Sequence, residues 1–152
     1  MFHLLPHHYT ALVVGASGGI GAAIIKQLLT SSQVGHIIAV SRQPSQINNS
    51  RLTHLVLDVS QEQDRQALQK ELAARPIHFF FNAIGILHDE TTQLIPEKRL
   101  DQLSFENLAQ TMNINAFTPI LLIAALQDSF KGSHPTIVTS LSARVGSIED
   151  NR

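Results

Sequence analysis

Five short runs of branched and aromatic apolar residues alternate with longer polar segments along this chain. Runs of about four to eight such residues, bounded by glycine, proline or polar residues, are typical of buried β-strands. The fourth run contains three consecutive phenylalanines, which favours a strand covered on both faces. The predicted strands are residues 10–14, 36–40, 52–57, 77–81 and 136–140.

Helical spacing dominates two of the segments between these strands. In the first, residues 19–29, Ile20, Ile24 and Leu28 recur on one side of a helix and predict the face that packs on the sheet. A second, longer helix is predicted over residues 105–130. Both helices connect consecutive strands.

A third, more polar helix is predicted before the fourth strand. Ser60 and Gln63 form a capping-box pattern at its start. Pro76 ends it near residue 74, because proline disfavours helix in the residue before it. The resulting order, in which strands alternate with helices, predicts an α/β fold of the Rossmann type, a doubly wound parallel sheet in a single domain over residues 1–152. In such sheets ligands bind at the carboxyl ends of the strands.

Composition narrows the function classes. The 152 residues carry a formal net charge of −1, which gives no electrostatic reason to expect nucleic acid or an anionic membrane as partner. The chain has no cysteine, and its eight histidines are scattered, so no metal site is expected. The longest uninterrupted apolar run, residues 120–126, is far shorter than a membrane span, and the N-terminus does not resemble a signal peptide. A cytoplasmic protein is therefore expected.

Glycines follow the first strand at a G-x-x-x-G-x-G spacing, formed by Gly15, Gly19 and Gly21. Gly15 permits a tight turn out of the strand, and the other two let the helix start approach a pyrophosphate, held by backbone amides and the positive helix end. Gly15, Ser17 and Gly19 also match G-x-S-x-G, the nucleophile elbow of α/β hydrolases. That alternative is disfavoured because an elbow normally follows several strands, whereas Ser17 follows the first.

This glycine segment resembles the motif of the short-chain dehydrogenase/reductase family, and further family motifs follow in order. The resemblance implies a dinucleotide-binding loop that comprises Gly15, Ser17, Gly19, Ile20 and Gly21. It also implies an oxidoreductase that moves hydride between a nicotinamide cofactor and a carbonyl or alcohol substrate of small size.

The ends of the second and third strands indicate which cofactor is used. Family members that prefer NAD usually carry an acid after the second strand, but here Ser41 and Arg42 stand there, with no Asp or Glu from Gly15 to Leu57. Arg42 is a cation suited to a 2′-phosphate, which predicts NADP, unless it is an ordinary surface arginine. The third strand leads into Asp58, which together with Val59 resembles the family pair that meets the adenine; Asp58 could alternatively act at a helix N-terminus.

The fourth strand leads into a segment similar to the family's Asn-Ala-x-Gly, made up of Asn82, Ala83, Ile84 and Gly85. In the family, the small residues leave room beside the adenosine, and the asparagine ties neighbouring strands together. Phe81 departs from the pattern, because the family usually has an asparagine before this segment.

Two residues are matched to catalytic positions of the family. Asn115, rather than Asn113, matches the helix asparagine whose backbone carbonyl anchors a relay water, since Ala-x-x-Pro follows it. Pro119 has no amide hydrogen, so the Asn115 carbonyl should lack its usual helical partner and the helix should kink. Ser142, with Ser140 as the weaker alternative, matches the serine that hydrogen-bonds the substrate oxygen.

One motif of the family, Tyr-x-x-x-Lys, is missing from the chain. In the family its tyrosine is the general acid, and its lysine lowers the pKa of that tyrosine. The only tyrosine is Tyr9, which precedes the first strand. The chain is therefore expected to be the cofactor-binding part of a domain incomplete at its C-terminus, and inactive alone. The run after Ser142 resembles the C-factor-like and small carbonyl-reductase branch, so the alternative function is a non-catalytic NAD(P)-binding signalling protein.

Self-association is the last expectation. Residues 120–126 are apolar around the full circumference of the predicted helix 105–130, so one face meets the sheet and another requires cover. The expected cover is a second copy of the chain, as is common in the family. Burial within the chain's own core is the alternative.

Overall fold

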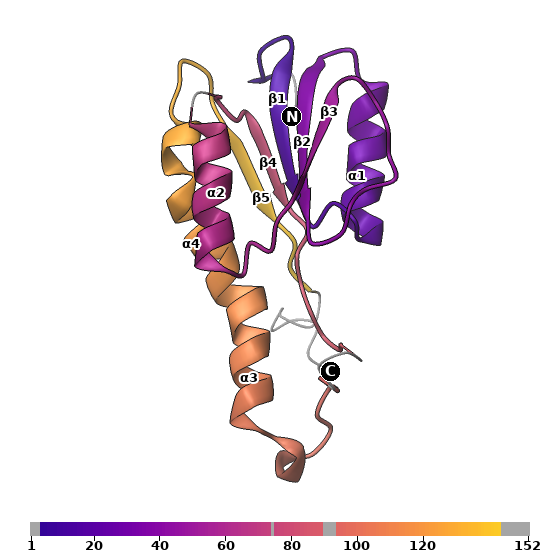
Figure 1. The fold of residues 1–152 in the computed structure, drawn as a ribbon, viewed down its shortest axis with the longest axis vertical. Helices are drawn as coiled ribbons and strands as arrows, with labels where there is room; N and C mark the ends of the chain where they lie inside the picture. The colour runs from indigo at the N-terminus through magenta and orange to yellow at the C-terminus, as the bar shows by residue number, and fades with distance from the viewer. Residues whose placement is uncertain (1–3, 74, 90–93, 144–152) are drawn as a thin grey trace.

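A five-stranded sheet forms the centre of the protein in a computed structural model that describes residues 4–73, 75–89 and 94–143. All four strand pairs are parallel, and the strand order is β3-β2-β1-β4-β5. The strands are β1 (Tyr9–Val14), β2 (Val34–Ser41), β3 (Leu52–Val56), β4 (Phe79–Asn82) and β5 (Ile137–Ser140). The predicted strands and the doubly wound Rossmann-type sheet are confirmed (Figure 1).

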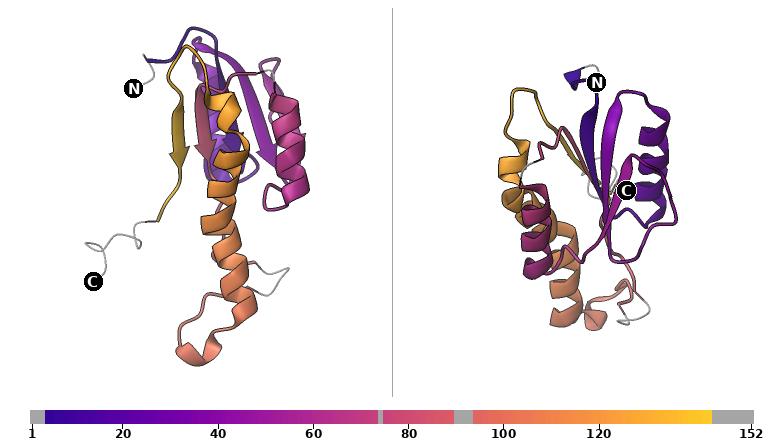
Figure 2. Two further views of the ribbon diagram at one scale, coloured as in Figure 1. Left: turned by 90° about the vertical axis from the view of Figure 1, so that its left-hand side faces the viewer. Right: turned by 45° about the horizontal axis from the view of Figure 1, so that its top comes forward.

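Helices cover both faces of this sheet. Helix α1 (Gly19–Thr30) lies on one face, and α2 (Glu62–Leu72) and α4 (Thr118–Ala125) lie on the other (Figures 1 and 2). Helix α3 (Phe105–Met112) leads into α4 and projects past the carboxyl edge of the sheet (Figure 1). Two short 3₁₀ turns, η2 (Leu100–Gln102) and η4 (Gln127–Phe130), flank this helical segment.

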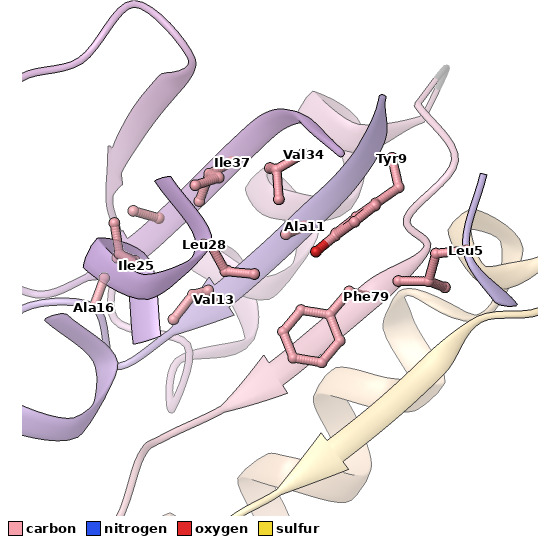
Figure 3. Close-up of a cluster of buried hydrophobic side chains, with 11 residues drawn as sticks. Leu5, Tyr9, Ala11, Val13, Ala16, Ile25, Leu28, Val34, Ile37 and Phe79 are labelled. Atoms are coloured by element: carbon pink, nitrogen blue, oxygen red, sulfur yellow. The ribbon is translucent and has the colours of Figure 1, made fainter. Parts of the chain in front are cut away.

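Side chains that alternate along the central strands build one apolar core on each face. Beneath α1, Ala11 and Val13 of β1 pack with Ile25 and Leu28 of the helix (Figure 3). On the opposite face, the core combines strand residues with residues of α2 and α4, namely Leu12, Val14, Ile38, Val40, Phe80, Leu68, Leu72 and Leu122. The central strands are therefore covered on both sides, as their apolar sequences predict.

The face of α1 that meets the sheet differs from the predicted one. Gly21, Ile25 and Leu28 are buried, whereas Ile20 is 56% exposed and Ile24 is only partly buried. A Cβ atom on Gly21 would lie 2.2 Å from the Gly15 carbonyl oxygen, so the helix touches the end of β1 through this glycine. That contact turns residues 21, 25 and 28 toward the core, and Ile20 is left at the surface.

The predicted capping box at the start of α2 is wrong. The helix begins at Glu62, and its N-cap, Gln61, makes no capping side-chain hydrogen bond. The Ser60 hydroxyl instead donates to the Asp58 carboxylate at 2.7 Å. The carboxylate of Asp58, two residues earlier, accepts from both the hydroxyl and the amide of Ser60. These charge-assisted bonds direct the Ser60 side chain away from the helix amides that a capping box would require.

The long predicted helix is interrupted before Pro119. A five-residue π-helical turn, η3 (Asn113–Phe117), separates α3 from α4, and the Thr118 amide donates to the Asn113 carbonyl across it. A proline that lacks an amide hydrogen cannot continue the regular bonding, and the regular helix is interrupted here, where the sequence predicts a kink; the kink itself stays a prediction. The state of the Asn115 carbonyl stays a prediction.

The combined helical stretch Phe105–Ala125 is long and apolar enough to cross a membrane by length and composition alone, with a mean hydropathy of 1.3. The sequence argument missed this because it considered only uninterrupted apolar residues. Only 11% of the window is buried, but Thr118 and Leu122 within it are fully buried against the rest of the protein. Length and composition alone are weak evidence for a membrane span, because helices that pack in a protein core pass the same test.

Candidate functional site

A cavity of about 350 Å³ opens at the carboxyl end of the sheet. Four neighbouring strands contribute their last residues or the loops that follow, and the π-turn and α4 close one side. Eight of the residues predicted from sequence line it: Gly15, Ser17, Ser41, Arg42, Asp58, Val59, Ala83 and Gly85. The structure thus brings together the ends of β1, β2, β3 and β4, which are far apart in sequence.

Gly15 forms the floor of this cavity where β1 turns into α1. Its φ of 82° lies in the left-handed region, which favours glycine. A Cβ atom there would lie 2.8 Å from the Ala83 carbonyl carbon, so the turn and the end of β4 are in contact through backbone. The glycine predicted for a tight turn is therefore required both by its conformation and by its neighbour.

The start of α1 presents unpaired amides. Among the described residues, no acceptor is bonded to the amides of Gly19, Ile20 or Gly21, and no acidic residue lies in the first helical turn. A Cβ atom on Gly19 would meet nothing within 4 Å, so protein packing does not require glycine there. Unpaired amides and the positive helix end favour an anion, and Gly19 leaves space for one to approach.

Arg42 supplies a cation at the rim of the cavity, directly after β2. Its side chain is exposed, and within the described ranges no hydrogen bond or ion pair engages its guanidinium. The neighbouring Ser41 is buried, and its carbonyl accepts a hydrogen bond from the Leu57 amide at 3.1 Å. The backbone that carries Arg42 is therefore fixed, while its guanidinium is available to a ligand.

Asp58 lines the same cavity as the glycine loop, directly after β3, which is separated from β1 by β2. Its Oδ1 atom accepts hydrogen bonds from the Ser60 amide at 3.0 Å and the Ser60 hydroxyl at 2.7 Å. Its backbone amide donates to the Asp64 carboxylate at 2.6 Å. These contacts orient the carboxylate that lines the cavity, although the same contacts give Asp58 a structural role at the loop before α2.

Asn82 is 1% exposed and does not line the cavity. Its Nδ2 atom donates to the Ser140 hydroxyl at 2.9 Å, and its Oδ1 atom accepts from the Ile84 amide at 3.3 Å. It thus links β4 to β5 and shapes the loop after β4, the role that the family resemblance implied. Gly19, Ile20 and Gly21 do not line the cavity, although Gly18, which precedes them, does.

The side chain of Asn115, in η3, binds the loop that follows β4. Its Nδ2 atom donates to the Ile86 carbonyl and its Oδ1 atom accepts from the Ile86 amide, both at 2.7 Å. A single side chain thereby binds both backbone groups of one loop residue. The contact holds the segment after β4 against the π-turn, which sequence reasoning did not foresee.

The predicted catalytic serine stands apart from these residues. Ser142 is exposed and does not line the cavity, whereas Ser140 is bonded to Asn82 within the sheet. Ser140 is also exposed, but its hydroxyl oxygen already accepts the hydrogen bond from Asn82, whereas no hydrogen bond within the described residues engages the hydroxyl of Ser142. The run beyond Ala143, which includes the rest of the segment that suggested the C-factor-like branch, lies outside the described residues.

Several wall residues were not predicted from sequence. Ile84 and Ile86 come from the loop after β4, and Ile114 and Thr118 come from the π-turn and α4. Ile114 and Thr118 are four positions apart on the helix that carries Asn115, so the spacing alone could have identified them as neighbours on one face. Of the loop residues, Ile84 occupies the variable position of the predicted Asn-Ala-x-Gly segment, whereas Ile86 carries no comparable signal.

Comparison with known proteins identifies the family. The model of the short chain dehydrogenase family matches residues 9–149, which is most of the chain. The chain therefore belongs to the short-chain dehydrogenase family, as its motifs predict.

Individual relatives agree with this assignment. The chain is 26% identical over 138 residues to a Saccharomyces cerevisiae protein named uncharacterized oxidoreductase TDA5 and covers 40% of that protein's length. The NADPH-bound carbonyl reductase from chicken fatty liver shares the fold with a TM-score of 0.78 at 20% identity, over 96% of this chain and 61% of that one. A carbonyl reductase from Pseudomonas aeruginosa gives a TM-score of 0.76 at 23% identity, over 93% of this chain and 62% of that one. The chain thus spans about two fifths to two thirds of these relatives.

Proposed function

We propose that this chain binds NADP(H) in the cavity, in an oxidoreductase that reduces a small carbonyl compound or oxidises the corresponding alcohol. One observation supports the proposal most strongly. An arginine without a described partner, Arg42, lines the same cavity as a glycine turn whose helix start has three unpaired amides. One anionic group at the helix start would accept hydrogen bonds from the unpaired amides, and a second would pair with the guanidinium of Arg42. A dinucleotide with a 2′-phosphate carries both groups in one molecule.

Each part of the cavity has a role in this proposal. The amides of Gly19, Ile20 and Gly21 would hold the pyrophosphate, and Arg42 would pair with the 2′-phosphate. Asp58 would accept a hydrogen bond from the adenine amino group. Val59, Ala83 and Gly85 would contact the adenosine. When bound, the cofactor supplies or accepts the hydride.

The catalytic roles rest on two residues of the second half. The Ser142 hydroxyl would donate a hydrogen bond to the substrate oxygen, and the Asn115 carbonyl would hold a water for proton transfer. Tyr9 does not fill the role of general acid, because it is 2% exposed, lies at the start of β1 and therefore at the opposite end of the strand from the cavity, and its pKa is raised by burial. The proposal therefore assigns the proton donor to no residue of these 152.

The cofactor assignment is tested by binding, which does not depend on turnover. We expect Arg42→Ala to weaken NADPH binding by roughly 1–3 kcal/mol, the range for a lost charge-assisted contact, and to leave NADH binding nearly unchanged. Fluorescence titration of both reduced cofactors measures this. Arg75→Ala is the matched control, because Arg75 is an exposed arginine beyond the end of α2, paired only loosely with Glu71 at 3.9 Å. Equal losses for both cofactors in Arg42→Ala would overturn the NADP assignment.

The chain is also proposed to form a dimer through an apolar stripe on α3, η3 and α4. Its members are each at least 45% exposed: Phe105, Leu108, Met112, Phe117, Ile120 and Leu121. A contiguous apolar stripe of this kind normally has a partner, and helical pairing is the family's common solution. A second copy of the chain is the occupant proposed here.

A further inference from the structure

His54, on strand β3, is hydrogen-bonded to the turn that carries Arg42. Its Nε2 atom lies 2.9 Å from the Ser41 hydroxyl oxygen, and its Nδ1 atom accepts a hydrogen bond from the Ser45 amide at 3.4 Å. The Ser41 hydroxyl in turn donates to the Gln43 carbonyl at 2.7 Å. One imidazole ring thus contacts both ends of the turn formed by residues 41–45.

These contacts admit a single consistent placement of protons. The Ser41 hydroxyl has one hydrogen, which it gives to the Gln43 carbonyl, so it must accept from His54 Nε2–H. Nδ1 then carries no proton and is the acceptor that the Ser45 amide requires. The network is complete with a neutral imidazole, and burial of the ring, which lowers the pKa of His54, favours that state.

The turn held in this way is part of the candidate site. Ser41 and Arg42 both line the cavity, whereas His54 does not. His54 lies in β3 opposite Ala39 of β2, so its ring reaches the turn from the neighbouring strand. Beyond the turn, the Ile47 amide donates to the Ser45 hydroxyl at 3.1 Å, which extends the ordered segment away from the strand.

We infer that His54 is a positioning residue for cofactor selectivity: it fixes the turn 41–45 so that Arg42 is presented to the 2′-phosphate. The inference rests on the proposed NADP(H) site. An exposed arginine on an unrestrained turn would have to be ordered on binding, and that ordering would subtract from the affinity for the phosphate. Because the hydrogen bonds of His54 already order the turn in the free protein, cofactor binding does not have to order it. NADH lacks the 2′-phosphate and gains nothing from it.

The chain contains a matched control on the same pair of strands. His36 of β2 is also partly buried, and its Nε2 atom lies 3.0 Å from the Thr53 hydroxyl of β3. Burial lowers the pKa of His36 as well. This second histidine–hydroxyl pair joins the first halves of the strands, and neither of its members lines the cavity.

The test compares His54→Leu, His54→Gln and His36→Leu by titration with NADPH and NADH and by thermal unfolding. We expect His54→Leu to weaken NADPH binding roughly three- to tenfold, as is reasonable for the loss of preorganisation, with NADH affected less than twofold. His54→Gln should show a smaller selective loss, because its amide nitrogen can still donate to Ser41. His36→Leu should change the midpoint of unfolding but not the ratio of the two affinities.

Two results would overturn the inference: an unchanged NADPH-to-NADH affinity ratio in both His54 variants, or a ratio shifted equally by His36→Leu. If His54→Leu fails to fold, His54→Gln alone decides between these outcomes. Arg42→Ala separates this inference from the proposed function. A selective NADPH loss in Arg42→Ala with unchanged His54 variants overturns only the role of His54. An Arg42→Ala variant that binds both cofactors like the parent chain overturns the proposed NADP site itself.

Discussion

The two halves of the chain differ in how well they bury their own residues. Strand β1 and its neighbour β2 are almost wholly buried and carry the glycine turn and Arg42 at their carboxyl ends. Helix α3 has no buried residue, and β5 alternates between partly buried and exposed positions. The parts proposed to hold the nucleotide are thus fixed by the chain's own packing, whereas Ser142 and the apolar stripe are exposed. Binding and chemistry should therefore be experimentally separable in this chain.

The largest effect expected from this difference is a complete separation of binding from turnover. The 152-residue chain should bind NADPH but should not oxidise it with any of a panel of aldehydes and ketones, because its single tyrosine is buried in the core under α1. Loss of NADPH absorbance is the measurement, with a family reductase that contains the Tyr-x-x-x-Lys motif as positive control. Turnover proportional to the concentration of this chain would contradict our placement of the chemistry.

The next largest effect is expected at the glycines that follow β1, where substitution of Gly21 should lower stability and substitution of Gly19 should weaken cofactor binding. Gly21→Ala should lower the free energy of unfolding by about 3 kcal/mol or more, because its Cβ atom would lie 2.2 Å from the Gly15 oxygen and the helix would have to shift. Gly19→Ala should leave that free energy unchanged or slightly raised, since its Cβ atom meets nothing within 4 Å. Denaturant unfolding measures both.

Cofactor titration completes this comparison. Gly19→Ala should bind NADPH more weakly than the parent chain, since the new methyl group occupies space left for the pyrophosphate. If Gly19→Ala is stable and binds normally, the phosphate position assigned to the start of α1 is wrong.

The last comparison concerns two residues of α4, the buried Leu122 and the exposed Ile120. Leu122 is fully buried, so Leu122→Ala should lower the free energy of unfolding by about 2–5 kcal/mol. Ile120 is 68% exposed, so Ile120→Asp should change that free energy by no more than about 0.5 kcal/mol in the monomer. Sedimentation at micromolar concentration should show a dimer for the parent chain and a monomer for Ile120→Asp. A monomeric parent chain would contradict the dimer proposal.

The strand positions and the parallel, doubly wound class of the sheet could be predicted from the sequence, because strands follow local apolar composition and their alternation with helices requires crossover connections. The spatial order β3-β2-β1-β4-β5 was not predicted. Each predicted strand exists, and eight of the predicted cofactor residues share one cavity because parallel strands end at the same edge. The face of α1 was mispredicted because helical periodicity cannot show that Gly21 touches Gly15. The cap at α2 was mispredicted because Asp58 competes for Ser60, and this competition depends on the path of the loop.

The partners in the contacts that organise the site could not be predicted from local sequence, because they join distant residues; only the strand-linking role of Asn82 was implied, by the family resemblance. Asn115 binds both backbone groups of Ile86, 29 positions away, and Asn82 binds Ser140, 58 positions away. His54 reaches Ser41 across 13 positions and a strand boundary. Residue type indicates that each of these side chains can form hydrogen bonds, but only the three-dimensional path of the chain determines the partner.

The central place of β1 has a consequence for how the protein folds. Its two neighbours are β2, which follows it closely in sequence, and β4, whose adjoining residue His78 is bonded to Thr10 across 68 positions. Pairing of β1 with β4 must therefore close a long loop before it gains any contact, and such non-local pairing is slow. On a ribosome, the glycine turn is made early, but Ala83, which it contacts, is synthesised much later. The nucleotide site is consequently a late product of folding, assembled only when both ends of this long loop have met.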